Sequence, residues 1–397
     1  MSGCYWVMLC GVIGLLAVCT SAKAQADTEK DNTLVEVLRQ AYHQNPTLRA
    51  ARLQLKSSHE NLSQAAAGWR PTVTATGEVL ANTTVGSNFG NADGSTSKEV
   101  GIGFNQPIYQ GGQVYAEYEA TNKRILAQSA VLNSTVQQIL LEAVAAYMDV
   151  LRDEALLDLS RQNENVIARQ LEAANDRFTV GELTKTDVAQ SEARHARALS
   201  DTIAAKADLE TSRARFEQIV GTFPHTLVYS DVSLPLPETV QDAVELAQVQ
   251  NPDILSAEML HEASEHDIRD IFGELLPSLS LFGNWARTYD PQPGTIDNTT
   301  SKSVGATLTI PLYQAGSVRS RVRQAKYDSN RLFIEIMEVK RQIRQNVIAN
   351  WEAWKAAKAE IDSRKRQVEA SMVAREGVYY ENELGARTVL DTLDADQ

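Results

Sequence analysis

The chain repeats itself over most of its length, and this duplication limits what it can fold into more than any other feature. Asn45-Pro46 reappears as Asn251-Pro252 at an offset of 206 residues. Pro107-Ile108-Tyr109-Gln110 reappears as Pro311-Leu312-Tyr313-Gln314 at an offset of 204 residues. Two long segments in register predict one duplicated unit of about 205 residues rather than an array of short repeats.

Each unit has the same expected order: a short helix, a helix capped by Asn-Pro, a pair of strands and a very long helix. Gln397 aligns with Ala193 of the first unit, so the second unit lacks a counterpart of 194–220 and is expected to be C-terminally incomplete. The predicted divisions are a signal peptide at 1–26, a first unit at 27–222, a linker at 223–237 and a second unit at 238–397.

The first 26 residues resemble a secretory signal peptide, because an apolar run from Cys4 to Cys19 precedes small-residue cleavage sites at 22–26. A signal anchor is the alternative, but the run is short for a membrane span. The mature chain is expected to begin near Gln25 or Asp27. All three cysteines lie before that point, so it would contain no disulfide.

The net charge of −13 makes nucleic acid an improbable partner. The sequence contains no P-loop, no dinucleotide-binding glycine motif, no zinc-protease motif and no cysteine cluster, and its six histidines are scattered. No nucleophile, base and acid stand in a recognisable pattern. We therefore expect no enzyme activity, no cofactor and no metal site.

Sequence periodicity and helix or strand breakers predict the individual elements. Turn-forming residues predict loops at 86–96 and 290–300, and Pro107 is expected to end strand pairing. The predicted helices are 34–43, 46–68, 113–178, 186–220 and 317–381, and the predicted strands are 72–85, 98–109, 278–289 and 303–313.

The first long helix has a narrow apolar stripe, formed by Val136, Leu140, Val144, Tyr147 and Leu151. Such a stripe is typical of coiled-coil packing with solvated flanks. The returning helix carries an alanine stripe that allows close approach, at Ala189, Ala193, Ala196, Ala204 and Ala207.

The strands alternate between apolar residues on one face and small or polar residues on the other, as in Val100, Ile102 and Phe104 against Gly101 and Gly103. A sheet with open edges cannot exist in lipid. Because four strands per chain are too few for a barrel, several chains would have to close the sheet together.

Two glycine-initiated turns are predicted to form tips between antiparallel helices. Gly181 precedes Thr184 and Asp187, and Gly385 precedes Thr388 and Asp391 with the same spacing. Glycine can end a helix in the left-handed conformation, and Thr with an acid three residues later can cap the next helix. A cap explains Asp187 and Asp391. It does not explain Asp394, one turn beyond Asp391, so the two stacked carboxylates predict a site.

With these motifs the sequence resembles the TolC-type outer-membrane efflux proteins, over about residues 33–397. The residues that carry the resemblance are Pro107 to Gly112, Pro311 to Gly316 and Gly385 to Ala395. The form of the last motif is most similar to the type I secretion branch, although such proteins also serve multidrug export.

The resemblance implies a mainly α-helical chain with a transmembrane β part. It implies a homotrimer with a 12-stranded outer-membrane β-barrel that continues into a periplasmic α-helical barrel. Such a channel of a Gram-negative outer membrane passively conducts substrates received from an inner-membrane ABC or RND-type pump through a periplasmic adaptor protein. Its lipid-facing strands contact outer-membrane lipid.

By the same resemblance, Thr186, Asp187 and Arg387 match residues that latch the closed periplasmic mouth, while Asp391 and Asp394 match an acidic ring lining it. Carboxylates gathered around one axis repel, so some are expected to titrate above their ordinary range. The chain departs from the family at Asn382, where a gating tyrosine is usual. The alternative from another class is a periplasmic coiled-coil adaptor or structural protein, which would lack the paired amphipathic strands.

Overall fold

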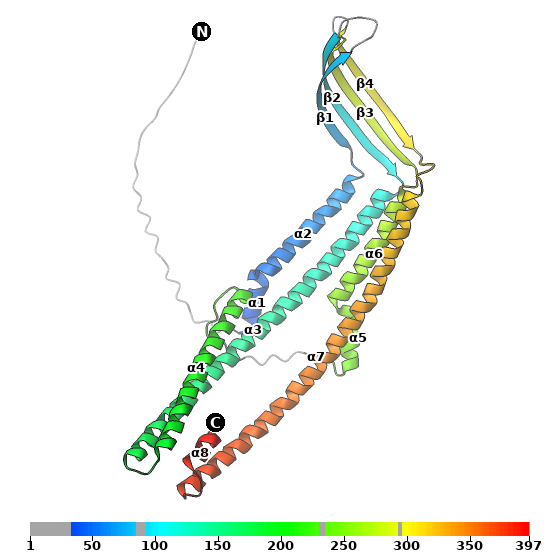
Figure 1. Cartoon of the computed structure of the whole chain (residues 1–397). Helices are drawn as coiled ribbons and strands as arrows, with labels where there is room; N and C mark the ends of the chain where they lie inside the picture. The colour runs from blue at the N-terminus through cyan, green and yellow to red at the C-terminus, as the bar shows by residue number, and fades with distance from the viewer. Residues whose placement is uncertain (1–32, 85–92, 230–234, 293–295, 397) are drawn as a thin grey trace, which may run out of the picture.

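The computed structural model describes residues 33–84, 93–229, 235–292 and 296–396. A sheet forms one end of the elongated molecule, and helices run from it to two tips at the other end (Figure 1). Helices α3 (Gln113–Thr179) and α7 (Ser317–Glu383) each contain 67 residues, or about 100 Å at 1.5 Å per residue. The expected signal peptide lies outside the described residues.

The sheet contains four antiparallel strands in the order β1-β2-β3-β4. Direct cross-strand partners share a face, so the register of the pairs places Val73, Phe104 and Val304 with the apolar residues and Thr74, Gly103 and Asn284 on the other side. The strands are β1 (Thr72–Thr84), β2 (Asp93–Gln110), β3 (Ser278–Gln292) and β4 (Ile296–Thr309).

Four predictions about the strands were wrong, the simplest being the end of the last strand, which stops at Thr309 and not at 313. Strand β2 begins at Asp93 and β4 at Ile296, inside the predicted loops, because pairing with a neighbouring strand outweighs the turn preference of Ser, Thr and Asn. Pro107 does not end pairing: β2 continues to Gln110 opposite β3, with a register shift between Pro107 and Tyr109. The β1 ladder stops at Asn105, so Pro107 lies where β2 has no β1 partner.

The other helices begin and end close to the predicted positions. Asn45 and Asn251 occupy equivalent caps, and each side-chain oxygen accepts two backbone N–H groups of the helix that follows. These helices are α1 (Leu34–Gln44), α2 (Pro46–Ala67), α4 (Lys185–Val220), α5 (Val240–Gln250), α6 (Pro252–Gly273) and α8 (Val389–Asp396).

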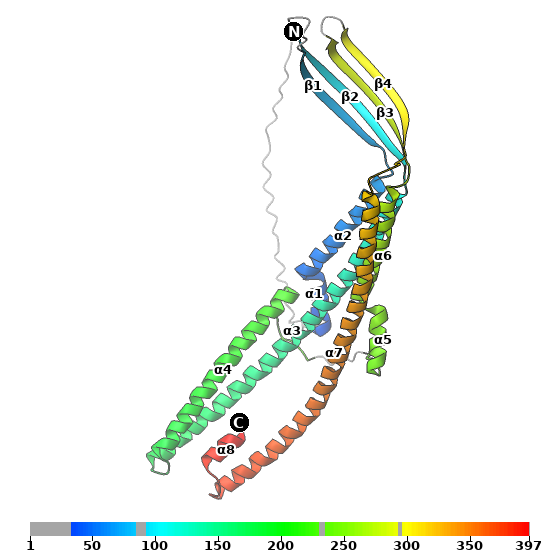
Figure 2. The same ribbon diagram turned by 45° about the vertical axis from the view of Figure 1, so that its right-hand side comes forward.

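Below the sheet, α2, α3, α6 and α7 run side by side in that order, and α4 returns along the lower half of α3 (Figure 2). The two helices of the first unit therefore lie beside the two equivalent helices of the second unit in one curved wall, with α3 and α6 in contact where the units meet. Both tips lie at the end far from the sheet, one between α3 and α4 and the other between α7 and α8 (Figure 1). This arrangement carries the two sets of predicted site residues to the same end.

The main apolar core lies where α1 and α4 pack on α3. Its α3 face differs from the predicted stripe: Ala143, Ala146 and Val150 are buried with Tyr147, whereas the other predicted residues are only half-buried. Small alanines on α3 allow two helices to approach closely, which a stripe of large residues would prevent. The predicted alanine stripe of α4 is exposed in the single chain.

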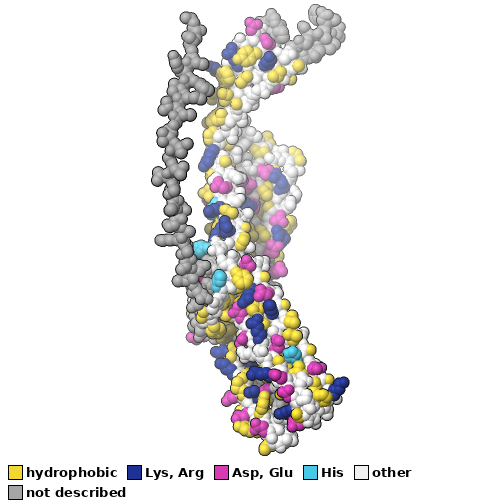
Figure 3. Space-filling view, turned by 90° about the vertical axis from the view of Figure 1, so that its left-hand side faces the viewer, with side chains coloured by type: hydrophobic (Ala, Val, Ile, Leu, Met, Phe, Trp, Pro, Cys, Tyr) yellow, Lys and Arg dark blue, Asp and Glu magenta, His cyan; other side chains and the backbone are white. Residues whose placement is uncertain are grey.

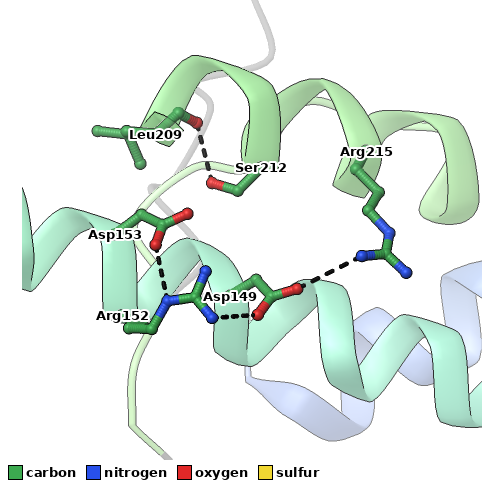
Figure 4. Close-up of polar contacts among 6 residues, drawn as sticks. All are labelled: Asp149, Arg152, Asp153, Leu209, Ser212 and Arg215. Carbon is green, nitrogen blue, oxygen red and sulfur yellow. Dashed lines mark hydrogen bonds and ion pairs between the residues drawn. The ribbon is translucent and has the colours of Figure 1, made fainter. Parts of the chain in front are cut away.

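Ion pairs reinforce the contact between α3 and α4 (Figure 4). Asp149 on α3 accepts from Arg152 at 2.8 Å and pairs with Arg215 of α4 at 3.6 Å. Nearby, the Ser212 hydroxyl donates to the Leu209 carbonyl, which satisfies a buried polar group within α4. The Asp149–Arg215 pair joins the two helices, and the apolar core that they share holds α4 along α3 and so positions the first tip.

The corresponding surface of the second unit is open in the part of the chain that the structure describes. Trp351 and Trp354 of α7 align with the fully buried Tyr147 and Val150 of α3, yet Trp354 is 45 % exposed. They line an apolar cavity of about 520 Å³ beside α5.

None of the described helices is long and apolar enough to span a membrane. On one face of the molecule, Lys and Arg are mixed with Asp and Glu along the helical part (Figure 3). The register of the strands places apolar side chains together on one face of the sheet.

Candidate functional site

The two tips are built by equivalent turns. Gly181 and Gly385 adopt φ of 82° and 74°, a left-handed conformation that favours glycine. At the first tip the N–H of Glu182 donates to the Arg177 carbonyl at 2.9 Å, and at the second the N–H of Ala386 donates to the Glu381 carbonyl at 2.8 Å. Both turns are therefore Schellman motifs, and the predicted left-handed glycine at the end of each helix is confirmed.

Each turn leads into a capping box. The Asp187 carboxylate accepts from the backbone N–H of Thr184 at 2.9 Å, and the Asp391 carboxylate accepts from the N–H of Thr388 at 2.9 Å. The Thr184 hydroxyl is the main group that lowers the pKa of Asp187, whereas for Asp391 the backbone N–H of Thr388 is the main cause. The predicted caps are confirmed.

Residues of both tips line one cavity of about 480 Å³. Asp187 of the first tip and Arg387 of the second tip both contribute to its wall, together with Arg177, Arg194 and Asn382. The structure thus brings together two predicted latch residues that are 200 positions apart. The third, Thr186, is exposed on the first turn of α4.

Within the single chain, Arg387 does not pair with Asp187 or Thr186. Its Nε donates to Glu381 at 2.9 Å, and this hydrogen bond is the main cause of the raised pKa of Arg387. Glu381 lies on the last turn of α7, so the nearest carboxylate comes from the same tip. Both side chains of this pair are about half exposed, so it constrains Arg387 weakly.

The two carboxylates of α8 that were predicted to form the ring, Asp391 and Asp394, have separate partners in the single chain. Asp391 caps its own helix, and Asp394 forms an ion pair at 2.7 Å with Arg194 of α4. The acidic ring predicted for these residues is a feature of a trimer and stays a prediction. In one chain the hydrogen bonds from Thr388 lower the pKa of Asp391, whereas the repulsion expected in a ring would raise it.

Asp396 is a site residue that the sequence interpretation missed. Its carboxylate accepts from Arg375 and from the Tyr379 hydroxyl on α7, and from Gln170 Nε2 of α3 at 3.1 Å. The side chain is only 7 % exposed. Its partners are 17 to 226 residues away, so no local motif could have predicted them. Asp394 and Asp396 together tie α8 to both helices of the first hairpin.

Asn382, where the family's gating tyrosine was expected, stabilises the turn instead, since its Nδ2 donates to the Arg387 carbonyl at 2.9 Å. The nearby Tyr379 contacts Asp396, and burial is the main cause of its raised pKa. Tyr379 therefore acts on α8, and it is not among the residues that line the cavity with Arg387.

At the far end of the molecule, the apolar face of the sheet is exposed. Val73, Val100, Ile102, Val304 and Leu308 lie on this face and are each half exposed or more. A sheet that is apolar on one side and polar on the other is the pattern of outer-membrane barrel strands. With helices about 100 Å long and paired tips, these features define a subunit of an outer-membrane export channel.

Comparisons with known proteins agree with this class. The family model described as "Outer membrane efflux protein" matches residues 37–222 and 243–397. The outer membrane efflux protein BepC of Brucella suis is 31% identical over 364 residues, 91% of this chain and 78% of BepC. TolC of Vibrio cholerae is 25% identical over 91% of this chain and 83% of its own.

The fold also matches solved channels. The Campylobacter jejuni CmeC outer membrane channel has a TM-score of 0.76 and 16% identity, over 91% of this chain and 79% of that chain. This chain belongs to the outer membrane efflux protein family. It is a channel subunit of the Gram-negative outer membrane that extends into the periplasm, and not an enzyme. Channels of this family are trimers that work with adaptor and pump partners.

Proposed function

We propose that this chain forms the passive exit duct of a tripartite export system, and that its two helical tips form the gate through which substrate enters. The adaptor is a periplasmic protein that docks at the helical end, and the pump is of the ABC or RND type. The observation that carries the proposal is the cavity shared by the two tips, which lies at the opposite end of the molecule from the membrane-facing sheet.

The latch of this gate consists of Arg387 with Asp187 and Thr186, joined between neighbouring tips in the closed trimer. Arg387 and Asp187 already line one cavity. The competing Arg387–Glu381 pair is exposed, so exchanging it for an Asp187 pair costs little. A guanidinium can donate two parallel hydrogen bonds to a carboxylate, which gives such a latch its geometry.

Asp391 and Asp394 form the acidic ring just inside this latch. Both lie on α8, directly after the tip, so a threefold axis would gather six carboxylates near one level of the duct. Two unit charges 6 Å apart repel by about 3 kcal/mol at an effective dielectric constant of about 20. A multivalent cation would relieve that repulsion and block the entrance.

The latch is tested by single-channel conductance of the purified trimer in a planar bilayer. Three exposed pairs of up to about 1 kcal/mol each would shift the closed–open equilibrium roughly 10- to 100-fold. Arg387→Ala and Asp187→Ala are therefore expected to raise the conductance. Lys185→Ala, an exposed neighbour at the same tip, is the control and should match the parent. Parent conductance in both latch variants would refute the latch.

The ring is tested in the same bilayer with a trivalent cation added on the side of the tips. Block should occur in the parent and disappear in Asp391→Ala/Asp394→Ala. Glu182→Ala removes an exposed carboxylate from the other tip and should leave the block intact. Equal block in the parent and the double variant would remove Asp391 and Asp394 from the site.

A further inference from the structure

We propose that the apolar face of the sheet carries a binding site for a lipid of the outer leaflet whose phosphate-bearing headgroup has a net negative charge. The site combines an apolar groove with three cations: Lys302 at the groove, and Arg287 and Lys98 in the rows beyond it toward the distal end of the strands. This inference depends on the membrane location of the sheet and not on the gate.

The three cations belong to three different strands and lie on the same face of the sheet. Lys98 pairs directly with Tyr289, Val100 with Arg287, and Trp285 with Lys302. Residues two apart on a strand lie on the same face, about 7 Å from each other. The cations therefore occupy three successive rows of the apolar face.

No carboxylate shares this face among the paired residues that the structure describes. Following the register, the side chains beside the three cations are those of Val, Ala, Gly, Ile, Phe, Leu, Trp, Tyr, Thr and Asn. Of the acidic strand residues, Glu78 and Glu99 pair with each other on the opposite face, and the Asp93–Thr84 pair shares that opposite face. Asp297 and Asp290 are not among the paired residues, and Asp290 lies at the register shift of β3. Segregation of this kind leaves a positive charge on the lipid side and a negative charge on the lumen side.

None of the three cations has an ionic partner within the described chain. Arg287 stacks over Tyr289 with its guanidinium 5.1 Å from the ring centroid, while its Nε is buried with no hydrogen-bond partner. Cations on the lipid face of a barrel are unfavourable away from the interface. An anionic headgroup would supply the missing partner, and Arg can bind phosphate through two hydrogen bonds.

The groove occupies the row of Lys302 and the row on its periplasmic side, and Arg287 and Lys98 lie in the two rows beyond it. It has a volume of about 380 Å³ and is lined mainly by Ile102, Phe104, Trp285 and Val304, with Lys302 at one margin. Gly283 forms part of its floor, which a larger side chain would narrow toward Phe104 and Val304. An acyl chain fits an apolar groove of this kind, and its phosphate would then lie at the level of the cations.

The three cations lie toward the distal end of the strands, and this position indicates the outer leaflet. The helices leave the other end of the sheet for the periplasm, so the rows of Lys302, Arg287 and Lys98 approach the external surface in that order. Trp285 and Tyr289 lie in the same rows, as expected of an aromatic belt at a membrane interface. Lys302, the deepest cation, can extend its ammonium group toward that interface.

The test uses the intact trimer in a neutral detergent and lipids with brominated acyl chains, which quench a nearby tryptophan. Trp285 fluorescence is isolated by subtracting the signal of a Trp285→Phe variant. Brominated phosphatidylglycerol and a brominated bisphosphorylated glycolipid are compared with brominated phosphatidylcholine. The parent should bind both anionic lipids at least about tenfold more tightly than phosphatidylcholine, and this preference should weaken with salt.

Lys98→Gln/Arg287→Gln/Lys302→Gln should lose the preference, whereas Lys98→Arg/Arg287→Lys/Lys302→Arg should keep it. Glu99→Gln changes a charge on the opposite face and serves as the control. Each variant is first checked for trimer formation; if the triple Gln variant does not assemble, the three single Gln variants are compared.

Equal quenching of the parent by anionic and zwitterionic lipids, or a preference that survives the Gln substitutions, would overturn the proposal. Complete competition by inorganic phosphate at millimolar concentration would also overturn it, because the site would then hold a free anion.

Discussion

Removing the Asp396 carboxylate should release α8 from the rest of the tip. In Asp396→Ala the donors Arg375, Tyr379 and Gln170 lose their common acceptor. Hydrogen bonds to a charged group contribute about 1.5–3 kcal/mol each when buried. Arg375 is 55 % exposed, so its share is strongly reduced by solvent. We expect a total of about 2 kcal/mol, or roughly a 30-fold shift toward undocked α8.

Hydrogen exchange followed by mass spectrometry measures this shift directly. Peptides that cover α8 and the Gln170 region of α3 should exchange faster in Asp396→Ala, while peptides from α1 should not change. Asp394→Ala removes only the more exposed ion pair with Arg194 and should give a smaller effect. Unchanged exchange of α8 in Asp396→Ala would refute the argument that this carboxylate holds the two units together at the tip.

Three further predictions concern stability. Thr184→Ala or Thr388→Ala should cost about 1 kcal/mol of local stability because the cap is lost, and hydrogen exchange of α4 or α8 measures this change. Folding lowers the pKa of Asp187 and of Asp391, so the stability that each cap contributes is present above the ordinary pKa of an aspartate. This contribution should fade as the pH falls below about 4. Asp270→Asn should raise the melting temperature at neutral pH. Burial, and after it the negative charge of Glu117, raises the pKa of Asp270, so the charged carboxylate destabilises the fold. An unchanged melting temperature would contradict this. Phe216→Ala should destabilise the α1–α3–α4 core by about 3–5 kcal/mol, seen in denaturant unfolding, because Phe216 is fully buried.

The elements that local rules control could be predicted from the sequence. The glycines of both tips, the Thr–Asp capping boxes and the Asn-Pro caps depend on residues within one turn of each other, and the structure confirms them. The first residues of β2 and β4, Asp93 and Ile296, could not be predicted. Cross-strand pairing depends on distant residues, and it extends these strands through turn-forming sequences.

The candidate site shows the same division between local and distant contacts. Asp187 and Asp391 were placed correctly as caps, and Arg387 lies at the cavity shared by the tips. The partners of Asp394 and Asp396 lie in α3, α4 and α7, and pairing over such sequence separations leaves no periodic signal. The buried face of α3 was also misassigned, since alanines that become buried against α1 and α4 resemble surface alanines in the sequence.

Chemical cross-linking across the tips tests the gate most directly. The cysteines of the chain all lie within the first 19 residues, so Asp187→Cys/Arg387→Cys introduces one defined pair into the expected mature protein at the shared cavity. Conductance of this trimer is recorded before and after treatment with a short bis-maleimide, and with a mono-maleimide as the control. The untreated variant should be open because the latch is lost, the bis-maleimide should close it, and the mono-maleimide should not. Unchanged conductance after complete cross-linking, verified by mass spectrometry, would contradict the assignment of the tips as the gate.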